Sequence, residues 1–229
     1  MSNISQDLKT PITAIKGYVE GIMDGVADTP EKMERYIKTI YNKANDMNRL
    51  INELTYYSGI DSNRIPYNFH RINVAEFFQD CVEDVGLDLE SKDIELNYSN
   101  LVDPDTRIIA DPEQLKKVIN NIIGNSIKYI DKPKGIINIR ILDEVDSIRV
   151  EIDDNGKGIA AKDLGSIFER FYRTDASRNS AMGGSGIGLS IVKKIIEDHG
   201  GYIWATSKEG EGTCLHFVIR KSREAEENE

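Results

Sequence analysis

The feature that most constrains the fold is a pair of apolar stripes at helical spacing near the N-terminus. Apolar residues recur every three or four positions, first as Ile4, Leu8, Ile12, Ile15, Val19, Ile22 and Val26, then as Met33, Ile37, Ile40, Ala44, Met47, Ile51 and Leu54. This spacing predicts two helices, and the second set is close to a heptad seam. A helical hairpin cannot bury so long a stripe by itself, so we expect two copies of the chain to pair into a four-helix bundle.

Turn residues mark where the elements begin and end. Gly25 and the segment Asp28-Thr29-Pro30 separate the two helices, with Thr29 suited to the N-cap and Pro30 to the first helical position. We therefore expect a hairpin over residues 1–58 and a linker over 59–69, which contains Gly59 and Pro66. A second domain is expected over 70–221, followed by an acidic, disordered tail over 222–229.

From residue 70 onward, strand and helix patterns alternate. The expected helices are 75–89, 113–129 and 188–198, and the expected strands are 94–98, 107–110, 136–142, 148–152, 202–206 and 213–219. Asp111 suits the N-cap of the second of these helices, and Gly200 suits the C-cap of the third. Strands that cluster with three helices predict an α/β sandwich, so the whole chain is expected to be α+β.

Composition excludes some classes of function. Asp and Glu outnumber Lys and Arg by 39 to 29, the net charge is -10, and no stretch is strongly basic. This argues against a nucleic acid as partner, because phosphate backbones are bound by clustered Lys and Arg. No apolar run is long enough to span a membrane and no signal segment is present. Cys81 and Cys214 show no metal-type spacing, so we expect two unpaired thiols in a reducing cytosol.

Three polar residues share one face of the predicted helix 113–129. Asn121, Asn125 and Lys128 are spaced by four and three positions. Two amides and an amine on one stripe can ligate a hydrated Mg²⁺ and the oxygens of a triphosphate, because amide oxygen is a hard ligand. For this helix alone, the alternative is an ordinary solvated polar face.

A carboxylate followed by two glycines comes directly after a predicted strand. Asp154 can accept a hydrogen bond from the exocyclic amine of adenine, while Gly156 and Gly158 let the backbone approach a ligand closely. The alternative is a hairpin turn, because Asn-Gly is its commonest sequence. A calcium loop is excluded, because Lys162 would occupy the position that requires a bidentate Glu.

A second glycine-rich segment, residues 183–188, opens the predicted helix 188–198. Backbone N–H groups at a helix N-terminus, together with the helix dipole, favour phosphate. The spacing matches neither the Rossmann nor the Walker A pattern, and a merely flexible loop is the alternative. Arg170 and Arg173 flank aromatic residues just before it, as expected of a mobile phosphate-binding lid or of an ordinary amphipathic turn.

Taken together, the order and spacing of these segments resemble the nucleotide-binding domain of sensor histidine kinases, in the wider group shared with Hsp90, gyrase and MutL. The matching segments are Asn121-x-x-x-Asn125 (N box), Asp154-x-Gly156-x-Gly158 (G1 box), Phe168 to Phe171 (F box), Gly184 to Gly188 (G2 box) and the terminal Gly210-x-Gly212-Thr213. Ser5-Gln6-Asp7-Leu8-Lys9-Thr10-Pro11 resembles the H box that begins the dimerisation and phosphotransfer helices. The resemblance covers residues 3 to 221.

The resemblance implies a role for each matched residue. Asp154 would bind the adenine amine, and Asn125 would ligate Mg²⁺ with Asn121 and Lys128 near the phosphates. Tyr129, Gly158, Ile159 and Thr213 would surround the base, while Arg173, Gly186 and Gly188 would hold phosphate. The other expected nucleotide-binding residues are Gly156, Tyr172, Gly184, Ser185, Ile187 and Leu189.

The resemblance also implies an activity and its partners. A homodimer would use Mg-ATP to phosphorylate a histidine and then pass the phosphate to an aspartate on a response regulator receiver domain. The chain begins in the middle of a motif, so we expect it to be the cytoplasmic piece of a longer protein that is anchored in a membrane upstream.

One departure from the family pattern affects the chemistry directly. The H box normally reads Ser-His-Asp/Glu-Leu, and here Gln6 stands where the phosphate-accepting histidine belongs. A carboxamide nitrogen is delocalised and not nucleophilic, whereas a neutral imidazole is available at neutral pH. The resemblance makes Asp7 the base, and Thr10 matches the position that orients water for dephosphorylation; both residues are present. We expect Gln6 to face solvent, and the chain to bind ATP without phosphorylating itself.

The other histidines do not replace the missing one. His70, His199 and His216 all lie outside the first predicted helix, and His199 is expected to be structural, as a cation favoured by a helix C-terminus. Gln6 is then explained either by an engineered substitution or by a naturally degenerate kinase that acts as an ATP-switched scaffold or phosphatase. The intact neighbours of Gln6 favour a recent or deliberate change.

Overall fold

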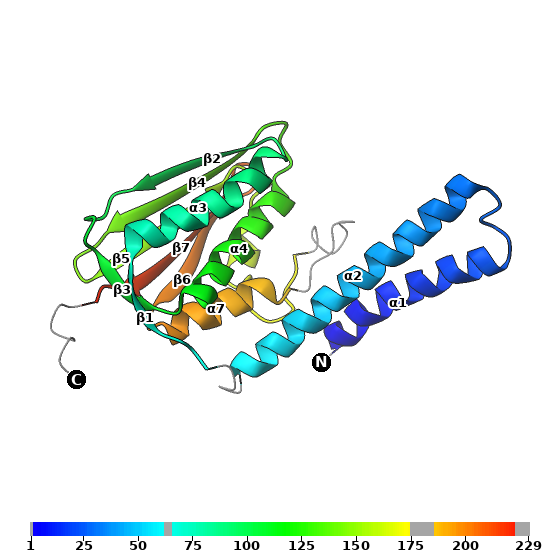
Figure 1. Ribbon diagram of the computed structural model, residues 1–229, viewed down its shortest axis with the longest axis horizontal. Coiled ribbons are helices and arrows are strands. Elements are labelled where there is room, and N and C mark those ends of the chain that lie inside the picture. Colours follow the sequence, from blue (N-terminus) through cyan, green and yellow to red (C-terminus); the bar gives the residue numbers. More distant parts are fainter. Residues whose placement is uncertain (1, 62–65, 175–185, 223–229) are drawn as a thin grey trace.

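The computed structural model describes residues 2–61, 66–174 and 186–222, without the side chains of residues 2–7, 57, 60 and 61. Two parts follow one another along the chain, a long helical hairpin and an α/β sandwich (Figure 1). The expected α+β class, with the hairpin first, is confirmed. None of the helices within the described ranges is both long and apolar enough to cross a bilayer.

The hairpin consists of α1 (Ser2–Met23) and α2 (Pro30–Asp61). Thr29 caps α2 as predicted, because its hydroxyl oxygen accepts the Lys32 N–H at 3.2 Å. Helix α2 continues to Asp61 and so runs past Ser58, beyond which the linker was expected. Gly59 alone does not end the helix, because one glycine costs a helix only about 1 kcal/mol.

Much of the predicted apolar stripe has no cover within a single chain. Ile12, Val19, Ile37 and Ile51 are 50%, 40%, 55% and 45% exposed. The two helices pack on each other, with the rings of Tyr18 and Tyr36 edge to face at 5.0 Å between centroids. The remaining exposed aliphatic surface is of the kind that a second hairpin would bury.

The second part is a mixed sheet with helices on one face (Figure 1). Its elements are β1 (His70–Asn73), α3 (Val74–Glu90), β2 (Ile94–Asn100), β3 (Arg107–Ala110), α4 (Pro112–Tyr129), β4 (Gly135–Asp143), β5 (Ser147–Asp154), α5 (Ala161–Leu164), α7 (Gly188–Asp198), β6 (Tyr202–Lys208) and β7 (Gly212–Arg220). The main sheet has the order β2-β4-β5-β7-β6, in which β2 and β4 are parallel and the other pairs antiparallel. β1 and β3 form a separate antiparallel pair.

Alternation along the strands gives the sheet two different faces. Ile137, Ile139 and Ile141 of β4 are almost fully buried against the helices, whereas Asn138 and Arg140 between them point to the other face. This period of two is what a half-buried strand requires. Helices α3, α4 and α7 cover the apolar face (Figure 1). We call the opposite, polar face the outer face of the sheet.

Asp111 connects three parts of the sandwich. It caps α4 as predicted, because Oδ1 accepts the N–H groups of Glu113 and Gln114 at 3.0 and 3.1 Å. Its other oxygen, Oδ2, accepts the Asn68 N–H at 2.8 Å, which fixes the segment that leads from the hairpin. The carboxylate is only 4% exposed, so these bonds are made largely out of water.

His199 is structural, but it is not the cation that its place at a helix end suggested. Its Nε2 accepts the Asp111 N–H at 3.0 Å, so Nδ1 carries the proton and donates to the Ile195 carbonyl at 2.7 Å. Burial lowers the pKa of His199, because a charged imidazole would lose its hydration. The neutral ring therefore joins the end of α7 to the start of α4.

Replacing Asp111 with Ala should destabilise the sandwich more than removing an exposed cap. The substitution leaves the N–H groups of Glu113, Gln114 and Asn68 without the acceptor that the buried Asp111 provides, so the free energy of unfolding should fall by about 2 kcal/mol. Asn73→Ala removes the exposed cap of α3, whose Oδ1 accepts the Glu76 N–H and whose Nδ2 donates to the Pro104 carbonyl, and should cost about 1 kcal/mol or less because both bonds are exposed. Urea unfolding followed by the fluorescence of Trp204 measures both, and equal losses would contradict this account.

Candidate functional site

A cavity of about 380 Å³ lies where α2, α4, the loop after β5, the start of α7 and β7 meet. The expected nucleotide-binding residues that line it are Asn121, Asn125, Lys128, Tyr129, Asp154, Gly158, Ile159, Tyr172, Arg173, Gly186, Gly188, Leu189 and Thr213. Gly156 lies beside the cavity, and Ile187 is buried at the start of α7 without lining it. Gly184 and Ser185 lie outside the described residues. Segments far apart in the sequence thus converge on one hollow.

Helix α4 presents its polar stripe to the cavity because its apolar stripe is held in the core. The buried residues of this helix are Leu115, Val118, Ile119, Ile122, Ile123 and Ser126. Asn121, Asn125 and Lys128 point the other way and line the cavity. The Asn121 amide donates to the Lys117 carbonyl at 2.9 Å, which leaves its oxygen beside Gly188, where an added Cβ would lie 3.1 Å from it. A hard amide oxygen therefore faces the start of α7.

Asp154 is held at the end of β5 by hydrogen bonds to both carboxylate oxygens. The Ser126 hydroxyl donates to Oδ2 and the Gly156 N–H donates to Oδ1, each at 2.9 Å. Burial raises the pKa of this carboxyl group, and the hydrogen bonds from Gly156 and Ser126 oppose that rise. The result is a fixed, largely desolvated acceptor in the wall of the cavity.

Two glycines let the loop after β5 pack directly on the β6–β7 turn. Gly158 has φ +71°, and a Cβ there would lie 2.1 Å from the Lys208 carbonyl oxygen. Gly212 has φ +149°, and a Cβ there would lie 1.9 Å from the Asp154 carbonyl oxygen. No other residue type fits this approach without moving backbone. The glycines therefore set the shape of the wall that carries Asp154.

The cavity also gathers positive charge. Burial, together with the nearby cations Arg173 and Arg49, lowers the pKa of Lys128 to about 8, and Glu53 opposes this shift. Cations that repel each other in this way are stabilised when an anion binds among them. No side chain among the described residues caps the N-terminus of α7, so its first N–H groups can also serve an anion.

Several residues of the cavity were not predicted from the sequence. They are Arg49, Glu53, Asn120, Gly124, Ser126, Lys157, Ile167, Thr174 and Leu215. Ser126 carries a signal that could have been used, because a polar residue on the buried stripe of a helix needs a partner. Arg49 and Glu53 carry none, because they belong to α2 and reach the cavity only through the placement of the hairpin against the sandwich.

The expected phosphotransfer residues all lie on α1. Gln6 and Asp7 are within that helix, but the structure does not describe their side chains. The expectation that Gln6 faces solvent therefore lies outside the described part of the chain. Thr10 is exposed on α1 and does not line the cavity. The structure therefore gathers the expected nucleotide contacts and keeps Thr10 apart from them.

Comparison with protein families agrees with this division of the chain. Residues 1–63 match the His Kinase A (phospho-acceptor) domain, and residues 110–223 match the histidine kinase-, DNA gyrase B- and HSP90-like ATPase family. Among solved structures, histidine kinase ThkA in complex with response regulator protein TrrA superimposes with a TM-score of 0.75 at 26% identity, over 96% of this chain and 60% of that one. Histidine kinase AdeS of Acinetobacter baumannii has the same fold, with a TM-score of 0.73 at 21% identity, over 94% and 98% of the two chains.

Curated relatives carry the same description. Sensor histidine kinase WalK of Bacillus subtilis is 32% identical over 231 residues, and sensor protein kinase WalK of Staphylococcus aureus is 30% identical over 221. These matches cover 100% and 96% of this chain, which spans 37% and 52% of the two relatives. From the matched domains, the cavity and these relatives, the chain belongs to the sensor histidine kinase family.

Proposed function

We propose that this chain binds Mg-ATP in the cavity described above and is the catalytic core from which a histidine kinase phosphorylates itself and then a response regulator. The observation that carries the proposal is the pairing of a fixed carboxylate with a cluster of cations and helix N–H groups in one hollow. Such a hollow suits a ligand with an amine-bearing ring and a polyanionic tail.

The direction of the bound nucleotide follows from α4. Ser126 contacts Asp154, while Asn121, five residues earlier, lies beside Gly188 at the start of α7. Five helical residues span about 7.5 Å, so the base and the phosphates would occupy different stretches of the same helix. Asp154 would accept the adenine amine, and the phosphates would lie beside Asn121 and the α7 N–H groups. The long side chains of Arg173 and Lys128, which also line the cavity, would reach them from its walls.

The amide oxygen of Asn125, one helical turn after Asn121 on the cavity-lining stripe of α4, would fit a hydrated Mg²⁺. Such an ion would neutralise phosphate charge when bound. The chain's own contribution is to bind and orient the triphosphate. Lys128 and Arg173 would hold the triphosphate oxygens. The close backbone packing at Gly158 and Gly212 fixes the wall that carries Asp154.

With Gln6 in the H box, we infer that the chain binds nucleotide but does not phosphorylate itself. The alternative function is a naturally degenerate kinase that serves as an ATP-switched scaffold or as a response regulator phosphatase. Thr10, at the position that orients water for dephosphorylation, suits the phosphatase role, whereas the intact neighbours of Gln6 favour a recent or deliberate change at position 6. The exposed aliphatic side chains of α1 and α2 support a homodimer through the hairpins. We infer a cytoplasmic location within a longer membrane-anchored sensor, because the relatives are sensor kinases of greater length.

Asp154→Asn should weaken binding of Mg-ATP by about 10- to 100-fold, because the adenine amine would lose a charge-assisted acceptor. Asp153→Asn is a matched control, because the Asp153 side chain points to the outer face, where it accepts a hydrogen bond from the Asn138 amide at 3.1 Å. Titration calorimetry with the non-hydrolysed analogue of ATP measures both affinities. Unaltered binding in Asp154→Asn, with the fold intact, would remove the adenine assignment.

The affinity for ATP should fall as the pH rises above about 8. Lys128 is charged below its pKa of about 8 and loses its proton above it, while bound phosphate favours the charged form and raises that pKa in the complex. Between the two pKa values the affinity should therefore fall by up to about tenfold per pH unit. Lys128→Arg keeps its charge throughout and should flatten this dependence. The same slope in both proteins would assign the effect to another group.

Gln6→His should restore phosphorylation if the change at position 6 is the whole defect. The imidazole would stand beside Asp7, which can hold one ring nitrogen and leave the other to attack the γ-phosphorus. We expect no acid-labile phosphate on the unchanged chain after incubation with labelled ATP, and clear incorporation on Gln6→His. Phosphate on the unchanged chain would reveal another acceptor. A revertant that binds ATP and dimerises but stays unlabelled would favour the degenerate kinase.

A further inference from the structure

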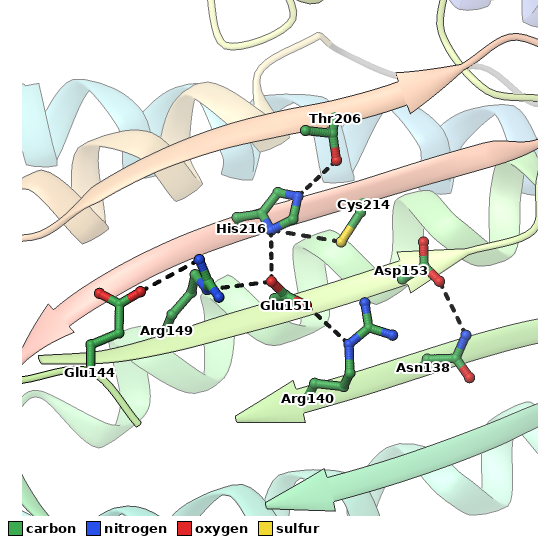
Figure 2. A network of polar contacts seen from close by, with 9 residues as sticks. All are labelled: Asn138, Arg140, Glu144, Arg149, Glu151, Asp153, Thr206, Cys214 and His216. Carbon is green, nitrogen blue, oxygen red and sulfur yellow. Dashed lines mark hydrogen bonds and ion pairs between the residues drawn. The ribbon is translucent and has the colours of Figure 1, made fainter. Parts of the chain in front are cut away.

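Three side chains with different metal-binding chemistry meet on the outer face of the sheet, away from the nucleotide cavity. Glu151 of β5 stands directly opposite His216 of β7 in the strand register, and Cys214 lies two residues before His216 on the same face. Their ligand atoms all lie within 4.8 Å of one another. Figure 2 shows the imidazole in contact with both the thiol, on its own strand, and the carboxylate, on the neighbouring strand.

The distances between these atoms are close to those that a tetrahedral ion requires. The His216 Nδ1 is 3.3 Å from Glu151 Oε1 and 3.9 Å from Cys214 Sγ. Around a tetrahedral Zn²⁺, the usual bond lengths place nitrogen, oxygen and sulfur ligands about 3.3 to 3.6 Å apart. Small side-chain rotations would therefore suffice, and the paired strands would not have to move.

The imidazole is already oriented as a metal ligand would be. Its Nε2 is bonded to the Thr206 hydroxyl at 2.8 Å, so Nδ1 faces Glu151 and Cys214 (Figure 2). Trp204 stacks on the ring, with 4.9 Å between centroids and an interplanar angle of 7°. A second hydrogen bond that fixes the ring is the usual support for a metal-bound histidine.

Two arginines share the carboxylate and limit the affinity for a cation. Arg140 donates from Nε to Glu151 Oε2 at 3.0 Å, and Arg149 Nε lies 3.4 Å from Oε1 (Figure 2). An ion-pair network between strands explains these three residues, but it requires neither a thiol nor an imidazole. Burial raises the pKa of the Cys214 thiol to about 12, so this thiol by itself is not a reactive nucleophile.

We propose that Glu151, Cys214 and His216 bind one Zn²⁺-class ion per chain, with water in the fourth position. Thiolate and imidazole select such ions over Mg²⁺, so this ligand set differs in kind from the amides of the cavity. Binding forms a bond from sulfur to the metal and releases the thiol proton to solvent. Asp154, which follows Glu151 on β5, and Thr213, which precedes Cys214 on β7, point to the other face of the sheet and line the cavity. The two sites are therefore separate.

Cobalt titration of the full chain under reducing conditions tests the proposal. Co²⁺ is the probe, because a thiolate ligand gives it a near-ultraviolet charge-transfer band, and Zn²⁺ should then displace it. We expect one equivalent of Co²⁺ to bind with that band. Cys214→Ser should abolish the band, and His216→Gln should weaken binding by about tenfold or more. Cys81→Ser, which removes the buried cysteine of α3, is the matched control and should keep the band.

The proposal is overturned by a band that survives Cys214→Ser, by its loss in Cys81→Ser alone, or by failure of the unchanged chain to bind Co²⁺ and Zn²⁺ at micromolar concentrations. Circular dichroism and nucleotide binding verify that each variant is folded. If Cys214→Ser does not fold, Thr206→Ala takes its place. It removes only the support of the imidazole and should weaken Co²⁺ binding by about tenfold, and an unchanged affinity there would also count against the site.

Discussion

The antiparallel pairing of β5 and β7 is the constraint on which both faces of the sheet depend. Because side chains alternate along a strand, the register that sets Asp154 opposite Thr213 also sets Glu151 opposite His216. Asp154 and Thr213 then line the cavity, and Glu151 and His216 point to the outer face. The same register requires glycine at position 212, since a Cβ there would lie only 1.9 Å from the Asp154 carbonyl oxygen. A shift by one residue would exchange the two faces.

The hairpin contributes to the cavity through the C-terminal half of α2. The Tyr56 hydroxyl bonds the Gln114 side chain, and the Lys117 ammonium lies 3.2 Å from the centroid of the Tyr56 ring. These contacts seat α2 on α4 and bring Arg49 and Glu53 to the cavity. The positive charge in the cavity therefore depends on how the hairpin sits on the sandwich. Movement of the helices would change which charged side chains line the cavity.

Sequence reasoning predicted those site residues whose neighbours lie nearby in the chain. Asn121, Asn125 and Lys128 fall on one face because helical spacing alone requires it. Asp154 was placed at a strand end because alternating residues precede it and glycines follow. The same reasoning gave His199 the wrong charge, because a position at a helix end favours a cation. The pKa of His199 is instead lowered by burial, and that burial depends on how α4 and the segment at Asn68 pack around the ring. It also missed Ser126, whose partner Asp154 is 28 residues away.

The sequence by itself determined the order of the parts, the two apolar stripes, the polar stripe of α4 and the glycines that a close backbone approach requires. Each of these follows from spacing or from the stereochemistry of one residue. Only the tertiary structure decided that Arg49 reaches the cavity and that Glu151 meets Cys214 and His216. The physical reason is that strand register and domain docking join residues far apart in the chain, such as Glu151 and His216, and no local pattern specifies the distance between them.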